Sequence, residues 1–296
     1  MEQKYILKNS KSFRAKDVFE CGQCFRWNIQ EDGSYTGIFK NNVINVKEEK
    51  SSSGYDITFE GICDGDIKEV CTNYFDLERD YEKIKEELSK VDENLRKAIC
   101  YGEGIRILNQ DLWETIISFI ISANNNIPRI KKIIENISKK YGDEIIFRGN
   151  KYYTFPDPQS LAKATMGDLR NLGTGFRDKY IFETTNSILT NKISLDNLQQ
   201  KETKKVREEL LKLPGVGPKV ADCILLFSNL SRFDVFPIDV WVRRVMNDLY
   251  IHNENEKNVK KQEIEKLAYE KFRNLEGLAQ QYLFYWKREN NTWVLE

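Results

Sequence analysis

Histidine is nearly absent from this sequence, and long apolar runs are missing altogether. His252 is the only histidine among the 296 residues, and it lies in a polar stretch. No apolar run approaches the roughly 20 residues that a membrane-spanning helix needs. The first residues, MEQKYILKNSKSFRAKD, also lack the apolar core of a signal peptide. The sequence therefore predicts a protein with no membrane partner.

Cysteine is sparse and unevenly placed. Its six positions are 21, 24, 63, 71, 100 and 223, too few for a disulfide framework in a chain of this length. Cys21 and Cys24 have the spacing of half a zinc or redox site, but no second pair or histidine cluster completes it. We therefore expect no metal site there, and a reducing compartment such as the cytoplasm.

A surplus of either charge is lacking as well. The chain carries 46 basic and 46 acidic residues, which argues against a protein that coats nucleic acid by bulk charge. Local basic clusters at 129–132, 139–140 and 201–207 are offset by acidic pairs elsewhere. Such runs usually mark solvated helix faces, and a basic face on one side is the alternative.

The chain changes character near residue 100. Short segments rich in β-branched and aromatic residues, at 25–27, 35–39, 43–46 and 55–59, alternate with turn sequences, which is typical of an antiparallel meander. Apolar residues at helical spacing dominate from about residue 92 onward. The sequence predicts an α+β fold, with a small N-terminal antiparallel β-sheet domain (1–100) followed by a helical body (101–296). Helices are expected at 64–75, 81–90, 176–188, 203–212, 218–228, 239–250, 258–273 and 276–289, and a helix start at Asp157–Pro158.

The most informative segment is Leu213–Asp222. A charged helix runs into the turn Pro-Gly-Val-Gly at 214–217, and an apolar helix follows. Two glycines in three residues permit a tight turn and let a ligand approach the backbone closely. The amides at the start of the second helix point outward, where the helix dipole favours an anion such as a nucleic-acid phosphate. An ordinary glycine-rich turn between helices is the alternative.

A lysine and an aspartate accompany this turn. Lys219 stands at the start of the second helix, beside apolar residues. Burial and the positive end of the helix dipole both disfavour an ammonium, so we expect a lowered lysine pKa and a usable nucleophile. Asp239 directly precedes another apolar helix, which fits a helix cap as well as a catalytic group.

These segments resemble the helix-hairpin-helix DNA glycosylase superfamily. The resemblance rests on Leu213-Pro-Gly-Val-Gly-Pro-Lys219 and Phe236-Pro-Ile-Asp239. It implies that the hairpin residues Gly215, Val216 and Gly217 contact DNA, that Lys219 attacks the sugar C1′ and that Asp239 completes the catalytic site. It also implies a bifunctional enzyme, a DNA N-glycosylase with DNA-(apurinic or apyrimidinic site) lyase activity, because members without the lysine only hydrolyse the base.

Further segments are similar to the 8-oxoguanine DNA glycosylase branch, in the family's order. They are Cys21–Trp27, Gly104–Asp111 with Ser122–Arg129, Leu172–Arg177 and Gly277–Phe284. The resemblance implies that the Gly22 carbonyl accepts a hydrogen bond from the N7–H that distinguishes 8-oxoguanine from guanine. It implies that Gln280 bonds the edge of the base, and that Phe284 and Cys223 cover its two faces. An extruded base needs such edge and face contacts.

The same resemblance supplies the residues that fill the gap left by the flipped base and contact the orphaned cytosine. These DNA-binding residues are Asn124, Asn125, Asn126, Arg129, Phe176 and Arg177. Taken alone, the three asparagines fit an ordinary loop between helices. Likewise, Phe284 and Gln280 taken alone fit a packing residue and a solvent-facing amide.

Two positions depart from the family pattern. Trp241 stands where a histidine is expected in the animal enzymes, and Phe176 replaces an expected tyrosine. These departures weaken what the resemblance implies about phosphate contacts and about the preferred opposite base. Endonuclease III-like relatives carry four clustered cysteines for an iron–sulfur cluster, whereas this chain has no cysteine after Cys223. We therefore expect no cofactor, apart from a cation that hairpin carbonyls could hold.

The expected partner is double-stranded DNA containing an oxidised purine, bound by a monomer. The expected location is a bacterial-type cytoplasm with its nucleoid, or the nucleus of a eukaryote. Two alternatives stay open at this point. One is a glycosylase of the same fold that removes another damaged base, and the other is a non-catalytic helix-hairpin-helix module that only binds DNA.

Overall fold

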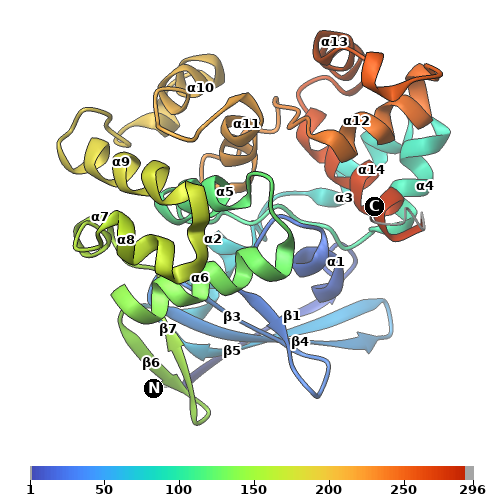
Figure 1. The fold of residues 1–296 in the computed structure, drawn as a ribbon. Coiled ribbons are helices and arrows are strands. Elements are labelled where there is room, and N and C mark those ends of the chain that lie inside the picture. The colour runs from blue at the N-terminus through green and yellow to red at the C-terminus, as the bar shows by residue number, and fades with distance from the viewer. Residues whose placement is uncertain (1, 291–296) are drawn as a thin grey trace.

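A five-stranded antiparallel sheet lies on one side of a larger helical body in the computed structural model, which describes residues 2–290 (Figure 1). The strand order is β1-β5-β4-β3-β2. The strands are β1 (Glu2–Ser10), β2 (Trp27–Ile29), β3 (Tyr35–Phe39), β4 (Asn42–Ser51) and β5 (Gly54–Ile62). The α+β fold and the antiparallel meander are thus confirmed. The sequence did not predict β1, a mostly polar edge strand that pairs only with β5.

The helical body surrounds the central helix α5, which is buried along most of its length. The helices are α1 (Ala15–Glu20), α2 (Ile67–Tyr74), α3 (Tyr81–Ser89), α4 (Glu93–Tyr101), α5 (Leu112–Ser122), α6 (Ile127–Tyr141), α7 (Pro158–Leu161), α8 (Met166–Leu169), α9 (Asp178–Leu189), α10 (Thr203–Leu210), α11 (Pro218–Phe227), α12 (Val240–Met246), α13 (Lys261–Phe272) and α14 (Glu276–Asn290). All the helices predicted by range are present. The predicted helix at 239–250 consists of α12 and a π-helical turn at Asn247–Ile251.

A two-stranded hairpin, β6 (Glu144–Phe147) and β7 (Asn150–Tyr153), was not predicted. Arg148 and Gly149 form its turn with φ of +49° and +76°, the conformation that two-residue hairpins favour. Arg148 bonds Glu2 and Glu60 of the main sheet. Phe147 packs on apolar residues of β3 and β4.

Aromatic rings fill the space between the sheet and α1 and α2. The rings of Phe19 and Trp27 stack with centroids 4.1 Å apart, and those of Phe39 and Tyr74 stack at 3.7 Å. The Trp27 indole donates a 3.0 Å hydrogen bond to the Tyr74 hydroxyl, so its one polar atom is satisfied. Trp27 is therefore a core residue.

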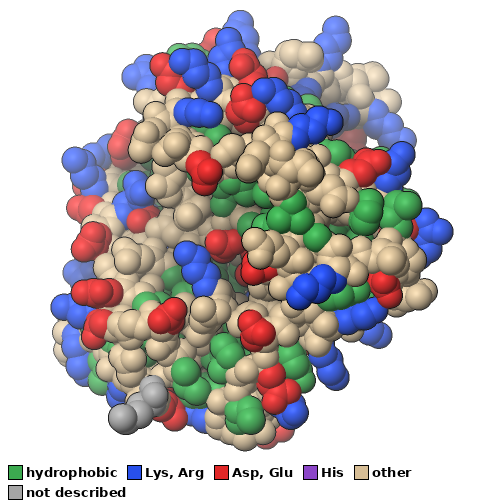
Figure 2. Space-filling model, turned by 90° about the vertical axis from the view of Figure 1, so that its left-hand side faces the viewer, with side chains coloured by type: hydrophobic (Ala, Val, Ile, Leu, Met, Phe, Trp, Pro, Cys, Tyr) green, Lys and Arg blue, Asp and Glu red, His purple; other side chains and the backbone are tan. Residues whose placement is uncertain are grey.

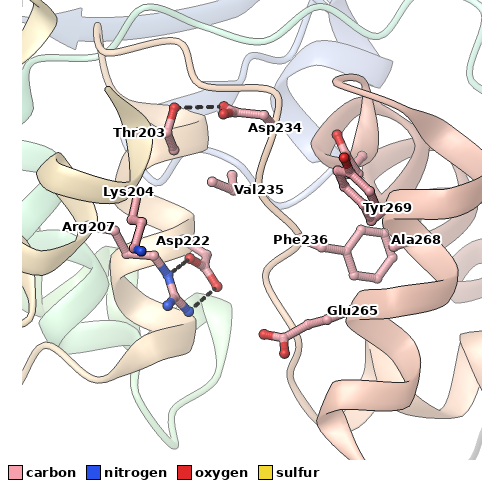
Figure 3. Close-up of a pocket in the computed structure, with 11 residues that line it drawn as sticks. Thr203, Lys204, Arg207, Asp222, Asp234, Val235, Phe236, Glu265, Ala268 and Tyr269 are labelled. Atoms are coloured by element: carbon pink, nitrogen blue, oxygen red, sulfur yellow. Dashed lines mark hydrogen bonds and ion pairs between the residues drawn. The ribbon is translucent and has the colours of Figure 1, made fainter. Parts of the chain in front are cut away.

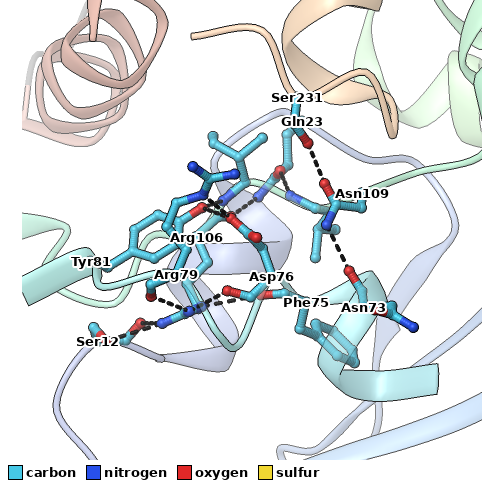
Figure 4. Close-up of polar contacts among 12 residues, drawn as sticks. Ser12, Gln23, Asn73, Phe75, Asp76, Arg79, Tyr81, Arg106, Asn109 and Ser231 are labelled. Atoms are coloured by element: carbon cyan, nitrogen blue, oxygen red, sulfur yellow. Dashed lines mark hydrogen bonds and ion pairs between the residues drawn. The ribbon is translucent and has the colours of Figure 1, made fainter. Parts of the chain in front are cut away.

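A buried arginine joins the loop that precedes α1 to the loop that follows α2 (Figure 4). Arg106 is 3% exposed and donates to the carbonyls of Phe75, Ser12 and Arg79 at 3.1, 3.2 and 3.1 Å. The side chain of Gln23 donates to the Arg106 carbonyl at 2.7 Å and accepts from the Leu108 amide at 2.9 Å. Because backbone groups in the interior need partners, these two side chains fix the loop that carries Gly22.

The first and last parts of the helical body lie side by side, since α4 packs against α14 (Figure 1). The main core joins apolar residues from both regions, among them Phe25, Leu95 and Leu278. Residues from before and after residue 100 therefore share one core, and no single position in the sequence separates the core of the sheet region from that of the helical body. Within residues 2–290, no helix combines the length and the apolarity that crossing a bilayer would require.

Candidate active site

The predicted hairpin consists of α10, a turn and α11. Gly215 has a φ of +80°, and a Cβ at this position would lie 2.8 Å from the Cβ of Tyr180 on α9, so only glycine fits. Gly217 precedes the first residue of α11, and a Cβ there would have no heavy-atom neighbour within 4 Å. The space beside Gly217, at the N-terminus of α11, is therefore open, as a phosphate-binding helix start requires.

Lys219 is the second residue of α11 and is half-buried. Its ammonium lies 5.7 Å from the centre of the Phe119 ring and hydrogen-bonds the sulfur of Cys223, one helical turn further on. Cys223 raises the pKa of Lys219 most, burial acts in the opposite direction, and the Asp239 carboxylate adds to the rise. The net pKa is raised. The sequence-based expectation of a lowered lysine pKa is therefore wrong for the DNA-free protein.

The difference has a local cause, Cys223 on the same helix, and a smaller tertiary one, Asp239. The sequence shows the apolar neighbours of Lys219, but not the distant carboxylate that the fold brings close. Burial raises the pKa of the Cys223 thiol to about 11, although Lys219 acts in the opposite direction. Before it can attack, Lys219 must therefore lose a proton that its surroundings in the free protein help to retain.

Asp239 is both a helix cap and a neighbour of the lysine. It is the N-cap of α12, and its Oδ1 accepts a hydrogen bond from the Val242 amide at 2.8 Å. Its charge is also one of the causes of the raised pKa of Lys219. Because one oxygen is enough for the cap, the two interpretations of Asp239 are compatible.

The N-terminal motif and the last helix meet at Gly22. Gly22 has a φ of +91°, and a Cβ there would lie 3.6 Å from Cε1 of Phe284 and 3.4 Å from Nη1 of Arg288. The Gln281 side chain donates to the Cys21 carbonyl at 2.5 Å, and Arg288 donates to the Glu20 carbonyl. Two predicted substrate-binding residues from opposite ends of the chain are thus in contact range.

The surroundings of Gln280 suit an amide that hydrogen-bonds the edge of a flipped base. It is 6% exposed, which rules out the solvent-facing alternative, and its Oε1 has no hydrogen-bond partner among residues 2–290. A buried acceptor without a partner costs about 1–3 kcal/mol. A ligand that donates a hydrogen bond to Gln280 would remove this cost.

Phe119 links the base-binding residues to the lysine. Its ring centre lies 5.6 Å from that of Phe25, which follows Gly22 in the N-terminal motif, and Lys219 lies over the same ring. Sequence reasoning missed Phe119, Tyr180 and Arg288. The first two lie on helices at positions that fit ordinary packing, so no local signal distinguishes them.

Hydrogen bonds hold the loop between α5 and α6, here called the asparagine loop (residues 123–126), in a defined conformation. Asn124 has a φ of +51°, a conformation that asparagine tolerates better than most residues. The Asn125 side chain donates to the Ile121 carbonyl at 3.1 Å. Asn126 caps α6 by accepting from the Arg129 amide at 3.0 Å. The loop is thus more than a simple connection, and its contact with DNA stays a prediction.

Phe176 and Arg177 differ sharply in exposure. Phe176 is 60% exposed and stands out as a wedge would, whereas Arg177 is 3% exposed. Arg177 donates from Nε to the Ala123 carbonyl at 3.0 Å and from Nη2 to the Asn124 carbonyl at 2.8 Å. Arg177 therefore holds the asparagine loop through two of its carbonyls, and its contact with the cytosine stays a prediction.

Cys21 and Cys24 are buried and donate to the carbonyls of Val18 and Phe19 at 3.4 and 3.8 Å. Burial raises the pKa of the Cys21 thiol to about 11, so both the hydrogen bonds and the burial favour neutral thiols. Within the described part of the chain, no three or more histidine, cysteine, aspartate or glutamate residues form a group that could hold a metal ion.

Two family models cover most of the chain. The model of the HhH-GPD superfamily of base excision DNA repair proteins matches residues 117–274, more than half of the sequence. The chain therefore belongs to this superfamily of DNA repair proteins. Residues 5–116 match the N-terminal domain of 8-oxoguanine DNA glycosylase, which identifies the branch that the sequence motifs resembled. The two models meet within α5.

Two proteins named as N-glycosylase/DNA lyases are similar over more than half of this chain. An N-glycosylase/DNA lyase of Saccharomyces cerevisiae is 31% identical over 273 residues, which cover 85% of this chain and 72% of that protein. A probable N-glycosylase/DNA lyase of Methanothermobacter thermautotrophicus is 35% identical over 204 residues, and there the match spans only 64% of that relative's length and 62% of this chain.

A solved structure is similar over nearly the whole chain. It shows the 8-oxoguanine glycosylase/lyase of Clostridium acetobutylicum with double-stranded DNA containing cytosine opposite 8-oxoguanine. That protein is 44% identical and superimposes with a TM-score of 0.89, covering 98% of both chains. The helical body, the hairpin and the N-terminal sheet thus form one arrangement common to both proteins.

Proposed function

We propose that this chain is a bifunctional DNA glycosylase/lyase that excises 8-oxoguanine from double-stranded DNA and then cuts the strand. The observation that carries this proposal is the position of Lys219, at the open start of α11 and beside Cys223 and Asp239. The pairing of Gly22 with Phe284 and the unpaired buried Oε1 of Gln280 supply the features of a base-binding site. The related lyases and the DNA complex of the Clostridium protein support the choice of substrate.

The reaction begins when the neutral amine of Lys219 attacks C1′ of the flipped nucleotide. The bond between C1′ and the base nitrogen breaks, and its electron pair leaves with the base, which takes up a proton. Asp239 stabilises the positive charge that develops on the sugar. The attached lysine nitrogen then loses a proton, and the C1′–O4′ bond breaks with its electron pair going to O4′, which takes up a proton. A Schiff base between Lys219 and C1′ results. Loss of a C2′ proton then expels the 3′ phosphate and cuts the strand.

In this mechanism the hairpin binds the backbone of the damaged strand, and the asparagine loop fills the space that the flipped nucleotide leaves between the neighbouring bases. The open space beside Gly217 at the start of α11 suits a backbone phosphate, and exposed Phe176 suits insertion beside the damaged pair. We propose that the protein acts as a monomer. We also propose that it holds no iron–sulfur cluster, because the sequence has no cysteine after Cys223. A cation held by the carbonyls of the hairpin turn is compatible with this proposal.

The decisive experiment is borohydride trapping on duplexes that carry 8-oxoguanine opposite each of the four bases, with undamaged guanine as the control. We expect a covalent adduct on the lesion duplexes and none on guanine. Replacing the nucleophile in Lys219→Gln should abolish the adduct, because an amide cannot form a Schiff base. Lys212→Gln is the matched control: Lys212 is exposed in the same hairpin, and its replacement should leave trapping intact.

The other outcomes identify the alternatives. An adduct that persists in Lys219→Gln would contradict the assignment of the nucleophile. Trapping on a different damaged base, but not on 8-oxoguanine, would identify a same-fold glycosylase for another lesion. Lesion-independent DNA binding with no adduct would identify a non-catalytic helix-hairpin-helix module.

A further inference from the structure

A cleft of about 310 Å³, separate from the candidate active site, lies between the α10–α11 hairpin on one side and α13 with the start of α14 on the other (Figure 3). None of its lining residues is among the predicted catalytic, base-binding or DNA-binding residues. The charged ones are Lys204, Arg207, Asp222, Asp234, Glu265 and Glu276. Four carboxylates thus face two cations in a protein whose net charge is +0. An excess of negative charge repels DNA phosphates and favours a cationic ligand.

Two of these carboxylates already have partners. Asp222 accepts two hydrogen bonds from Arg207, at 2.6 and 3.2 Å, and Asp234 accepts one from the Thr203 hydroxyl at 2.9 Å. These bonds are drawn in Figure 3, on the hairpin side of the cleft. Asp222 and Asp234 are therefore already satisfied within the protein, and we assign them a structural role in the wall of the cleft.

Glu276 differs from them. It is 5% exposed, and its Oε2 has no hydrogen-bond partner among the described residues. Burial raises its pKa, hydrogen bonds from the backbone amides of Glu276 and Asn274 act in the opposite direction, and the charge of Asp234 adds to the rise. A buried carboxylate oxygen without a partner is costly, and a cation in the cleft would remove that cost.

The opposite wall completes the surroundings of a cation. Glu265 projects from α13 toward the hairpin side, as Figure 3 shows. Tyr269, also on α13, is 71% exposed, and Phe236 presents a second ring nearby. Aromatic faces attract alkylammonium ions, whereas a compact metal ion needs a ligand cluster that the described residues do not form here.

We propose that this cleft binds a primary alkylammonium ion, which donates hydrogen bonds to Glu276 and Glu265 and packs its alkyl chain on Tyr269. The ammonium comes either from a small diamine or from a lysine side chain of a partner protein. The bound ion would lie beside the segment that leads to the catalytic residue Asp239. Residues 234–236 line the cleft, and the chain continues from them to Asp239, the cap of α12.

The test measures binding of 1,4-diaminobutane and of N-acetyl-lysine methylamide to the DNA-free protein by titration calorimetry. We expect saturable binding of at least one probe. Glu276→Gln should weaken it about tenfold, because charge-assisted hydrogen bonds contribute about 1.5–3 kcal/mol. Tyr269→Leu, at an exposed position that folding does not require, should weaken it about threefold through the lost cation–π contact.

Glu263→Gln is the matched control, since Glu263 is an exposed carboxylate of α13 that does not line the cleft. Its affinity for either probe should equal that of the unmodified protein. Stronger binding of the diamine would indicate a small-molecule ligand, and stronger binding of the lysine derivative a partner protein. Absence of saturable binding of both probes, or equal affinity in all variants, would overturn the proposal. The assay contains no DNA, so its result is independent of the proposed glycosylase activity.

Discussion

At the residue scale, the protonation of Lys219 decides when the site can react. Cys223 is the largest cause of its raised pKa, and Asp239 adds to it against the effect of burial. Only the neutral amine is nucleophilic, and the amine fraction grows as the pH approaches that raised pKa. The rate of covalent trapping should therefore rise with pH.

Replacing Cys223 should move this profile. In Cys223→Ala the largest cause of the raised pKa is absent, so the pKa of Lys219 falls and the rate of trapping reaches its plateau at lower pH. The measurement is the pH dependence of single-turnover trapping on abasic-site DNA, where no base contact with Cys223 is needed. Cys100→Ala, at an exposed position on α4, should leave the profile unchanged. A Cys223→Ala profile that stays in place or moves to higher pH would contradict this account.

The two roles of Asp239 can be separated by one substitution. Asn caps helices as well as Asp does, so Asp239→Asn should change the free energy of unfolding by no more than about 0.5 kcal/mol. The loss of charge should slow single-turnover excision about 100-fold or more. Asp157→Asn is the control, because Asp157 caps α7 through the Ser160 amide at 2.7 Å and takes no part in the site. Equal loss of rate in both variants would show that the cap alone matters.

At the scale of elements, the two hairpin glycines should respond differently to alanine. Gly215→Ala forces a side chain into a φ of +80° and against Tyr180, so it should lower the free energy of unfolding by about 2 kcal/mol and weaken DNA binding. Gly217 has a φ of −87°, which alanine adopts, and its surroundings are open. Gly217→Ala should therefore keep its stability and weaken only DNA binding.

Urea denaturation and fluorescence anisotropy with a duplex measure the two effects separately. Unchanged stability in Gly215→Ala would contradict the contact with Tyr180. Undiminished DNA binding in Gly217→Ala would mean that no phosphate approaches the start of α11. Gly215 also shows how elements depend on one another, because the hairpin turn rests on Tyr180 of α9, and Phe176 lies in the short turn just before this helix.

At the scale of the whole molecule, a net charge of +0 requires DNA affinity to come from local surfaces. Figure 2 shows lysine and arginine side chains gathered along the upper edge of one face, with acidic side chains between them. Bound phosphates still release counterions, so affinity should fall on the order of tenfold or more between 50 and 200 mM salt. Anisotropy titrations across this range test the prediction. A flat salt dependence would count against phosphate contacts.

The sequence determined the strands and helices whose apolar period and turn residues are local. It also indicated the hairpin and the candidate site residues, because motifs keep their spacing along the chain. It missed β1 and the β6–β7 hairpin, the first a polar edge strand with one pairing partner and the second a hairpin held partly by Arg148 against the sheet.

Only the tertiary structure decided the surroundings of the side chains. The meeting of Gly22 with Phe284, the burial of Gln280 and the bonds of Arg177 to the asparagine loop join residues far apart in the sequence. The pKa of Lys219 is a mixed case, since its largest cause, Cys223, lies four residues away on the same helix, whereas only the fold brings Asp239 close. Motif spacing is a property of the chain, whereas burial and charge proximity depend on distances in space that exist only after folding.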